Sequence, residues 1–170
     1  MESKVRMDTM LENMTMFNEI GDRCVLTERM IDAPADEVYK KTIDSGLVPQ
    51  WWGPADMTTM VEKMDVRVGG NWRYIQHDKD GKEFIFSGEY KEVVPNERLS
   101  YTFNYEAMPG APMTETVTFV DLAGKTLILI ADCFESKDQL DQMMKMDMER
   151  GATETMNRFA MLFQPAMMTK

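Results

Sequence analysis

Gln50-Trp51-Trp52-Gly53-Pro54 sets two adjacent tryptophans directly before a Gly-Pro pair, and Gly69-Gly70-Asn71-Trp72 follows it in the sequence. Proline lacks a backbone donor, so the first segment cannot continue a helix or a central strand. The two indole rings must therefore be buried at a tight corner between elements. Such a pair either plugs that corner or lines the mouth of a cavity, and we favour the plug. The glycine pair allows a bend or bulge with close backbone approach.

Length and charge limit the class of protein. The chain has 170 residues, which fits one domain with a sizeable core. Its 29 acidic and 19 basic residues give a net charge of −10, which argues against nucleic acid or an anionic membrane as a partner. Two cysteines are too few for a secreted disulfide framework, and neither a basic-then-apolar leader nor a membrane-length apolar run is present. We therefore expect a cytoplasmic protein.

The N-terminal residues differ in pattern from the rest. Apolar side chains recur there at helical spacing: Met7, Met10, Leu11, Met14 and Phe17. We expect residues 1–20 to form an arm or a short amphipathic helix that packs on the domain or on a second copy. Residues 21–165 are then a single domain, and residues 166–170 are a tail. The oligomeric state stays open, with a homodimer as one alternative.

The order of elements after residue 24 is a strand, two short helices, several strands and a long helix. A strand is expected over 25–31, and Ala33-Pro34-Ala35-Asp36-Glu37 starts a helix that Gly46 stops. A second short helical turn runs into Trp51-Trp52. Apolar and polar residues then alternate over 84–91, 99–105 and 116–119, as in antiparallel strands with one buried face. The run 127–131 lacks alternation and predicts a strand buried on both faces.

One long helix is expected from Lys137 to Phe163, because a stripe of apolar residues recurs at helical spacing: Leu140, Met144, Met148, Ala152, Met156, Phe159 and Phe163. At about 1.5 Å per residue it would be about 40 Å long, enough to cross a sheet. An antiparallel sheet with its helices on one face is an α+β fold. The acidic run from Glu135 to Glu149 is interpreted as the solvated face of this helix.

Together these segments resemble the Aha1-type family, meaning proteins similar to the C-terminal domain of the activator of heat-shock protein 90 ATPase, within the START/pollen-allergen (SRPBCC) superfamily. The resemblance covers about residues 25–163 and rests on these segments: Asp32-Ala33-Pro34, Val38-Tyr39, Trp51-Trp52-Gly53-Pro54, Asp65-Val66-Arg67-Val68-Gly69-Gly70, Trp72, Asp80-Gly81, Gly88-Glu89-Tyr90-Lys91-Glu92-Val93-Val94-Pro95, Glu97-Arg98-Leu99 and Gly151-Ala152-Thr153-Glu154.

The resemblance implies a helix-grip fold, in which about seven antiparallel strands wrap around the C-terminal helix. In that sheet Cys24 and Cys133 lie on neighbouring strands, and for a cytoplasmic protein we expect a reduced, buried pair. The family usually has tryptophan where this chain has Ala152, which would enlarge the interior unless methionines fill it. Gly151 within the last helix predicts either close passage of a sheet side chain or room for a ligand.

The inward positions of sheet and helix are the candidate ligand-binding residues: Trp72, Tyr74, Phe84, Phe86, Tyr101, Phe103, Phe119, Met144, Met148, Met156 and Phe159. They form either a closed core or an apolar cavity with a few polar groups, which is the usual form of a small-molecule site. The 19 methionines allow both interpretations, since methionine replaces leucine in ordinary cores and also lines deformable pockets. We favour the cavity.

Signals for catalysis are few. His77, the single histidine, is interpreted as a surface residue beside a turn. One histidine and two distant cysteines cannot form a standard zinc site, so no metal and no other cofactor is predicted. The leading hypothesis is non-enzymatic binding of a hydrophobic small molecule between sheet and helix. The alternatives are an Aha1-like protein-interaction module acting on a chaperone or another partner, and a cyclase- or hydrolase-like enzyme that uses the same cavity.

Overall fold

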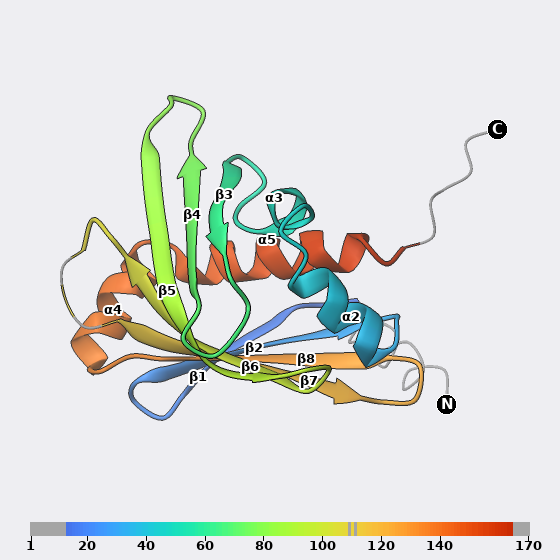
Figure 1. The fold of residues 1–170 in the computed structure, drawn as a ribbon. Helices are drawn as coiled ribbons and strands as arrows, with labels where there is room; N and C mark the ends of the chain where they lie inside the picture. The colour runs from blue at the N-terminus through green and yellow to red at the C-terminus, as the bar shows by residue number, and fades with distance from the viewer. Residues whose placement is uncertain (1–12, 109, 111, 165–170) are drawn as a thin grey trace.

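The computed structural model describes residues 13–164 apart from residues 109 and 111. Over these residues one antiparallel sheet of eight strands has the order β1-β2-β8-β7-β6-β5-β4-β3. The strands are β1 Met16–Ile20, β2 Cys24–Ile31, β3 Thr58–Met64, β4 Asn71–His77, β5 Glu83–Val94, β6 Arg98–Tyr105, β7 Met113–Asp121 and β8 Thr126–Cys133. The helices are α2 Ala35–Thr42, α3 Val48–Trp51, α4 Lys137–Lys145 and α5 Met148–Met161. The sheet curls around α5, which confirms the helix-grip fold (Figure 1).

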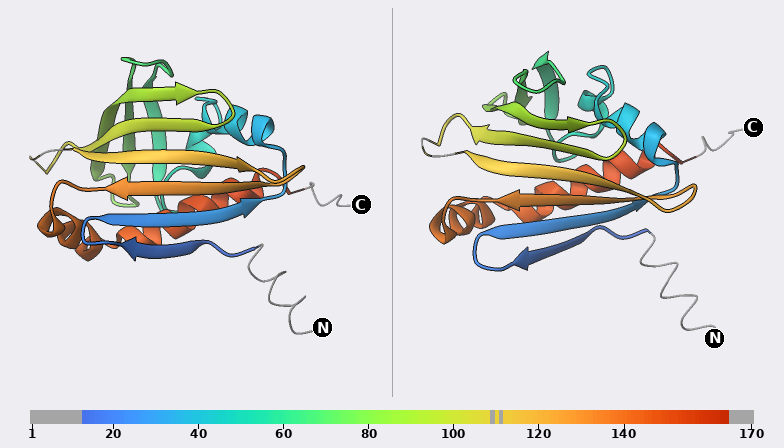
Figure 2. Two further views of the ribbon diagram at one scale, coloured as in Figure 1. Left: turned by 90° about the horizontal axis from the view of Figure 1, so that it is seen from below. Right: turned by 60° about the horizontal axis from the view of Figure 1, so that its bottom comes forward.

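The sheet begins one strand earlier than expected. Residues 16–20, expected to belong to an arm or amphipathic helix, form β1 and pair with β2, with Phe17 opposite Thr27. Phe17 packs against buried side chains, whereas Met16 and Ile20 are exposed. Strand pairing with β2 thus replaces the helix inferred for this stretch, and only Phe17 of the five residues is partly buried. Met7, Met10 and Leu11 lie outside the described residues. Figure 2 shows β1 beside β2 at the edge of the sheet.

Helix α2 forms where the sequence predicts a helix, with small shifts at its ends. Pro34 is the N-cap, acidic residues occupy the first turn, and Lys40 and Lys41 occupy the last turn. This distribution of charge complements the helix dipole. The helix ends at Thr42, before Gly46, because the Asp44 side chain accepts a hydrogen bond from the Gly46 backbone (2.9 Å) in a turn outside the helix.

The tryptophan pair occupies the corner between α3 and the sheet. Trp51 ends α3 and is buried with its ring 4.8 Å from that of Phe159. Trp52 points toward the sheet, with its ring centroid 5.1 Å from that of Tyr74. Gly53 has a φ of +92°, and a β-carbon there would lie 1.9 Å from the Gln76 amide nitrogen. Only glycine fits this corner, and the two indole rings that fill it also line a cavity between α5 and the sheet, so both alternatives for the tryptophan pair hold.

Hydrogen bonds join this corner to α5. The Arg158 guanidinium donates to the Gly53 carbonyl (2.8 Å) and to the Gln50 carbonyl (2.9 Å). The Gly53 amide in turn donates to the Thr155 hydroxyl (3.1 Å). The corner therefore fixes the position of α5 over the sheet.

The expected long helix is two helices. Asp147 has a left-handed backbone (φ 63°) and separates α4 from α5. Leu140 of α4 packs with Val25, Met113 and Phe134 in a cluster of its own, whereas α5 packs on the main core. An uninterrupted straight helix could not follow both surfaces of the curled sheet, so the chain turns at Asp147.

Strand β8 is buried on one face, so the prediction of burial on both faces is wrong. Thr126 and Ile128 point into the core, while Leu127 and Leu129 are half-buried on the other face. The five residues from Leu127 to Ala131 are all apolar, so the sequence shows no alternation of apolar and polar residues even though the two faces of the strand differ in burial.

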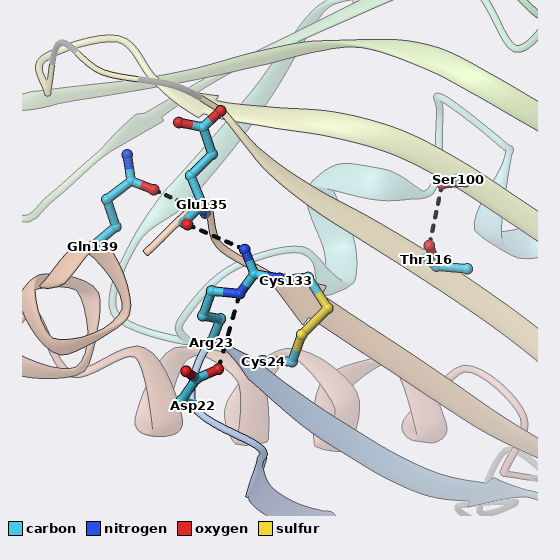
Figure 3. Close-up of a disulfide and its surroundings, with 8 residues drawn as sticks. All are labelled: Asp22, Arg23, Cys24, Ser100, Thr116, Cys133, Glu135 and Gln139. Carbon is cyan, nitrogen blue, oxygen red and sulfur yellow. Dashed lines mark hydrogen bonds and ion pairs between the residues drawn. A yellow bond between two sulfur atoms is a disulfide. The ribbon is translucent and has the colours of Figure 1, made fainter. Parts of the chain in front are cut away.

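Cys24 and Cys133 face each other on β2 and β8, as the resemblance implied, but they form a disulfide. The expectation of a reduced, buried pair is therefore wrong, and both residues are only half-buried. Figure 3 shows the bond next to Arg23, which donates to the Glu135 carbonyl (3.3 Å). Antiparallel pairing places the two β-carbons on the same face of adjacent strands, which is the arrangement that a disulfide requires.

Candidate functional site

A cavity of about 450 Å³ lies between α5 and the concave face of the sheet. Its size is within the usual range for small-molecule sites. The walls come from β2, β4 to β8, the tryptophan corner, the junction of α4 with α5, and α5 itself. Most lining side chains are aromatic, aliphatic or methionine. The structure therefore has a cavity where a closed core was the alternative.

Seven of the eleven residues predicted from the sequence line this cavity: Phe84, Phe86, Tyr101, Phe103, Met148, Met156 and Phe159. They come from β5, β6 and α5, so the inward alternation of two strands and the apolar stripe of one helix identified them. Phe86 and Phe103 also contact each other, with ring centroids 5.5 Å apart.

The other four predicted residues lie elsewhere. Trp72 and Tyr74 are buried behind Trp52, which takes their place in the cavity wall. Phe119 packs edge-on against Tyr39 of α2, with ring centroids 5.6 Å apart. Met144 belongs to the separate cluster beneath α4. Because the last helix breaks at Asp147, Met144 lies on α4 and does not share a face with the apolar residues of α5.

Two small residues widen the helical wall of the cavity. A β-carbon built at Gly151 would meet no heavy atom within 4 Å, and Gly151 and Ala152 both line the cavity. Of the two explanations for Gly151, close passage of a sheet side chain is therefore wrong, and open space remains. A larger side chain at position 152 would occupy part of this cavity, and the methionines nearby do not fill that space.

A row of polar side chains crosses the floor of the cavity. Tyr101 on β6 is paired in register with Glu115 on β7, and Glu115 is paired with Asp132 on β8. The Tyr101 hydroxyl donates a hydrogen bond to the Glu115 carboxylate. Cross-strand neighbours on one face are in contact distance, so these three side chains form a connected network. We call Thr27, Tyr101, Glu115 and Asp132 the polar floor; all four line the cavity.

The polar floor is incompletely hydrogen-bonded. Thr27 Oγ1 and Asp132 Oδ1 are buried and have no hydrogen-bond partner among the described residues, and Asp132 is only 3% exposed. Trp51 Nε1, a donor at the end of α3 that also lines the cavity, is a third buried group in this state. Unpartnered buried polar groups are costly and rare, so they are expected to serve a purpose.

Burial raises the pKa of Asp132 well above its ordinary value, and the charge of Glu115 and a hydrogen bond with it raise that pKa further. Burial, followed by the charge of Glu115, also raises the pKa of Tyr101. We therefore place the proton of the carboxyl pair on Asp132, which donates it to an ionised Glu115. Glu115 is then a carboxylate with two donors, from Tyr101 and from Asp132.

Asp132→Asn should change how stability depends on pH. The native state holds the Asp132 proton at pH values where the unfolded chain has lost it, so the free energy of unfolding falls as pH rises above the unfolded pKa of 3.8. The fall ends at the raised native pKa, and its slope cannot exceed about 1.36 kcal/mol per pH unit. In Asp132→Asn this fall should be absent. The free energy of unfolding of the variant should therefore increase with pH relative to that of the original protein. Urea unfolding between about pH 4 and 8 measures the difference.

Asp22→Asn is the matched control, because Asp22 is exposed and does not line the cavity. It should leave the pH dependence as it is. An Asp132→Asn protein whose unfolding free energy follows that of the original chain at every pH would contradict the assignment of the proton.

The rim of the cavity is also acidic. Five acidic side chains line the cavity against a single basic one, Arg150, among the described residues: Asp56, Asp78, Glu115, Asp132 and Asp147. Arg150 contacts Asp56 (3.0 Å), Glu154 (3.2 Å) and Asp147 (4.0 Å). Its charge is thus shared among three carboxylates at the rim. Acidic side chains therefore outnumber basic ones among the described residues that line the cavity.

Sequence reasoning missed the polar floor, although a signal for it was present. Glu115 occupies an inward position between Met113 and Val117, and Asp132 follows Ile128 and Ile130 with the same period. An acidic residue in a row of inward apolar residues marks a buried charge. The pairing register, which brings these acids together, could not be derived from the pattern. His77, expected at the surface beside a turn, is half-buried at the end of β4 and outside the cavity, with Nε2 3.1 Å from Glu83 Oε1.

Among residues 13–164, apart from residues 109 and 111, no cluster of three or more His, Cys, Asp or Glu side chains is arranged to hold a metal ion. No helix in residues 13–164 is both long enough and apolar enough to cross a bilayer.

The fold and its cavity define a helix-grip domain of the SRPBCC type. Residues 32–164 match the profile of the family described as "Activator of Hsp90 ATPase homolog 1-like protein". This chain belongs to that family. A search of curated proteins finds no significant match.

Solved structures similar to this chain show the same fold. Protein Ms6760 from Mycobacterium smegmatis superposes with a TM-score of 0.78 at 19% identity, covering 89% of this chain and 99% of that one. An Arthrobacter aurescens protein reaches 0.77 at 23% identity, covering 89% and 92%. The AHSA1 protein from Silicibacter pomeroyi reaches 0.67 at 20% identity, covering 82% and 96%. At these identities the likeness extends to the fold alone.

Proposed function

We propose that this protein binds a hydrophobic small molecule in the cavity between the sheet and α5, without transforming it. The observation that carries the proposal is the apolar cavity of about 450 Å³ beneath Gly151 and Ala152. Burying apolar ligand surface there contributes about 25 cal/mol per Å² before the costs of ordering are subtracted. A cytoplasmic location is part of the proposal.

The tested change is Ala152→Trp, which restores the large side chain usual in the family. The neutral fluorophore N-phenyl-1-naphthylamine should bind the original protein with increased fluorescence and should raise its melting temperature. In Ala152→Trp the indole fills the cavity, so binding should fall by about tenfold or more. Fluorescence titration measures both dissociation constants.

Met161→Trp is the matched control, since Met161 lies on the same helix, is 65% exposed and does not line the cavity. This variant should bind the fluorophore as the original protein does. The proposal fails if the original protein leaves the fluorescence unchanged, or if Ala152→Trp and Met161→Trp bind equally well.

The polar floor supports a second candidate, acid–base catalysis on a ligand held in the cavity. An ionised Glu115 and a protonated Asp132 are the groups that proton transfer to and from a substrate requires. Exchange of the α-protons of 4-phenylbutan-2-one with deuterated solvent, followed by NMR, tests it. Exchange no faster than in buffer, or unchanged in Glu115→Gln, would leave binding as the function.

An interaction module of the Aha1 type has less support. The exposed large apolar side chains are spread over β1, β3, α5 and several loops. A docking surface would gather them in one patch. Affinity capture of a chaperone from cell extract would reverse this ranking.

A further inference from the structure

The polar floor specifies which kind of molecule the cavity takes. It offers two buried oxygens without a hydrogen-bond partner among the described residues, Thr27 Oγ1 and Asp132 Oδ1, next to the Glu115 carboxylate, which accepts from the Tyr101 hydroxyl. Thr27 lies two residues from Val25, the register partner of Asp132, and points to the same face of the sheet. The acceptors therefore converge on one region of the floor.

The carboxyl groups of the polar floor have no cationic partner among the described residues. No described lysine or arginine forms an ion pair with Glu115 or Asp132, and Glu115 accepts a hydrogen bond from the Tyr101 hydroxyl. The rim adds Asp56, Asp78 and Asp147 against one arginine. A buried carboxylate is stable only when it is paired or well hydrogen-bonded. Glu115 is hydrogen-bonded but has no cationic partner, and two oxygens beside it lack donors, so a cation with several N–H donors would complete the site.

We infer that the cavity binds a primary ammonium carried on an apolar body, with the ammonium on the polar floor and the body against the aromatic and methionine walls. An ammonium has three donors and one positive charge. These match the two unpartnered oxygens and the Glu115 carboxylate. The inference rests on the proposed function, since the same cavity must admit a small molecule.

A matched set of ligands tests the inference without any mutation. 4-Phenylbutylamine, 4-phenylbutan-1-ol and 4-phenylbutyrate share one apolar body and differ in their polar end. Each is titrated against the protein loaded with N-phenyl-1-naphthylamine at pH 7. The amine should displace the fluorophore at a concentration about tenfold or more below that of the alcohol, because charged hydrogen bonds are stronger than neutral ones. The carboxylate should be the weakest competitor.

Glu115→Gln removes the charge and keeps the shape of the side chain. It should weaken the amine by about tenfold or more and leave the alcohol within about twofold. Glu149→Gln is the control, because Glu149 carries the same charge on an exposed position of α5 outside the cavity. This variant should leave all three affinities unchanged.

The outcomes separate the inference from the proposed function. If the fluorophore binds but the amine and the alcohol compete equally, the cavity binds small molecules and the ammonium inference is wrong. The same conclusion follows if Glu149→Gln weakens the amine as much as Glu115→Gln does. If the fluorophore does not bind at all, the proposed function itself fails.

Discussion

Phe159→Ala is expected to lower the free energy of unfolding by about 3 to 5 kcal/mol. Phe159 is 1% exposed, packs edge-on against Trp51 and Phe163, and joins α5 to the tryptophan corner. Removing the ring leaves a void next to an existing cavity, and the rigid corner cannot collapse into it. Urea unfolding followed by tryptophan fluorescence measures the loss.

Phe159→Leu tests whether the loss comes from volume. Leucine keeps most of the apolar surface, so this variant should lose less than about 1.5 kcal/mol. Phe163→Ala removes the same kind of ring from a half-buried position and should cost less than Phe159→Ala. Equal losses at positions 159 and 163 would contradict the role of Phe159 as the central contact of α5.

Removal of the disulfide is the second large effect that we expect. The bond joins residues with a sequence separation of 109, so it closes a long loop and strongly restricts the unfolded chain. The double variant Cys24→Ser/Cys133→Ser should therefore lose roughly 4 kcal/mol, within a usual range of about 2 to 5. Reduction of the original protein with dithiothreitol should produce the same loss, measured by urea unfolding.

The double variant is its own control, because dithiothreitol should leave its stability unchanged. Titration of thiols in the unreduced, unfolded protein should find no reactive thiol. Two reactive thiols would contradict the disulfide. A stable disulfide would in turn count against the cytoplasmic location, since such bonds are rare in the cytosol.

Local patterns in the sequence determined the architecture. Pro34 and the charges around it determined α2, the Gly53-Pro54 pair determined the corner, and alternation in β6 determined which side chains point inward. Each of these rests on a property of a few adjacent residues, such as a missing donor or a period of two. For the same reason seven of the eleven residues that were predicted from the sequence line the cavity.

Contacts between distant residues were beyond such patterns. The stripe from Leu140 to Phe159 is continuous in the sequence, and only packing on two separate clusters shows why the helix breaks at Asp147. The displacement of Tyr74 from the cavity by Trp52 depends on how α3 docks, which no local pattern records. Tertiary packing determines both features, because the burial of side chains outweighs local propensity.

By itself, the sequence determined that this chain is a helix-grip domain and that aromatic and methionine side chains face its interior. Only the tertiary structure decided that the interior is hollow and that its floor is polar. The reason is register: pairing of β6, β7 and β8 aligns Tyr101, Glu115 and Asp132, which are far apart in the chain, and burial then moves the proton to Asp132. Strand pairing is set by the whole core and cannot be read from any one strand.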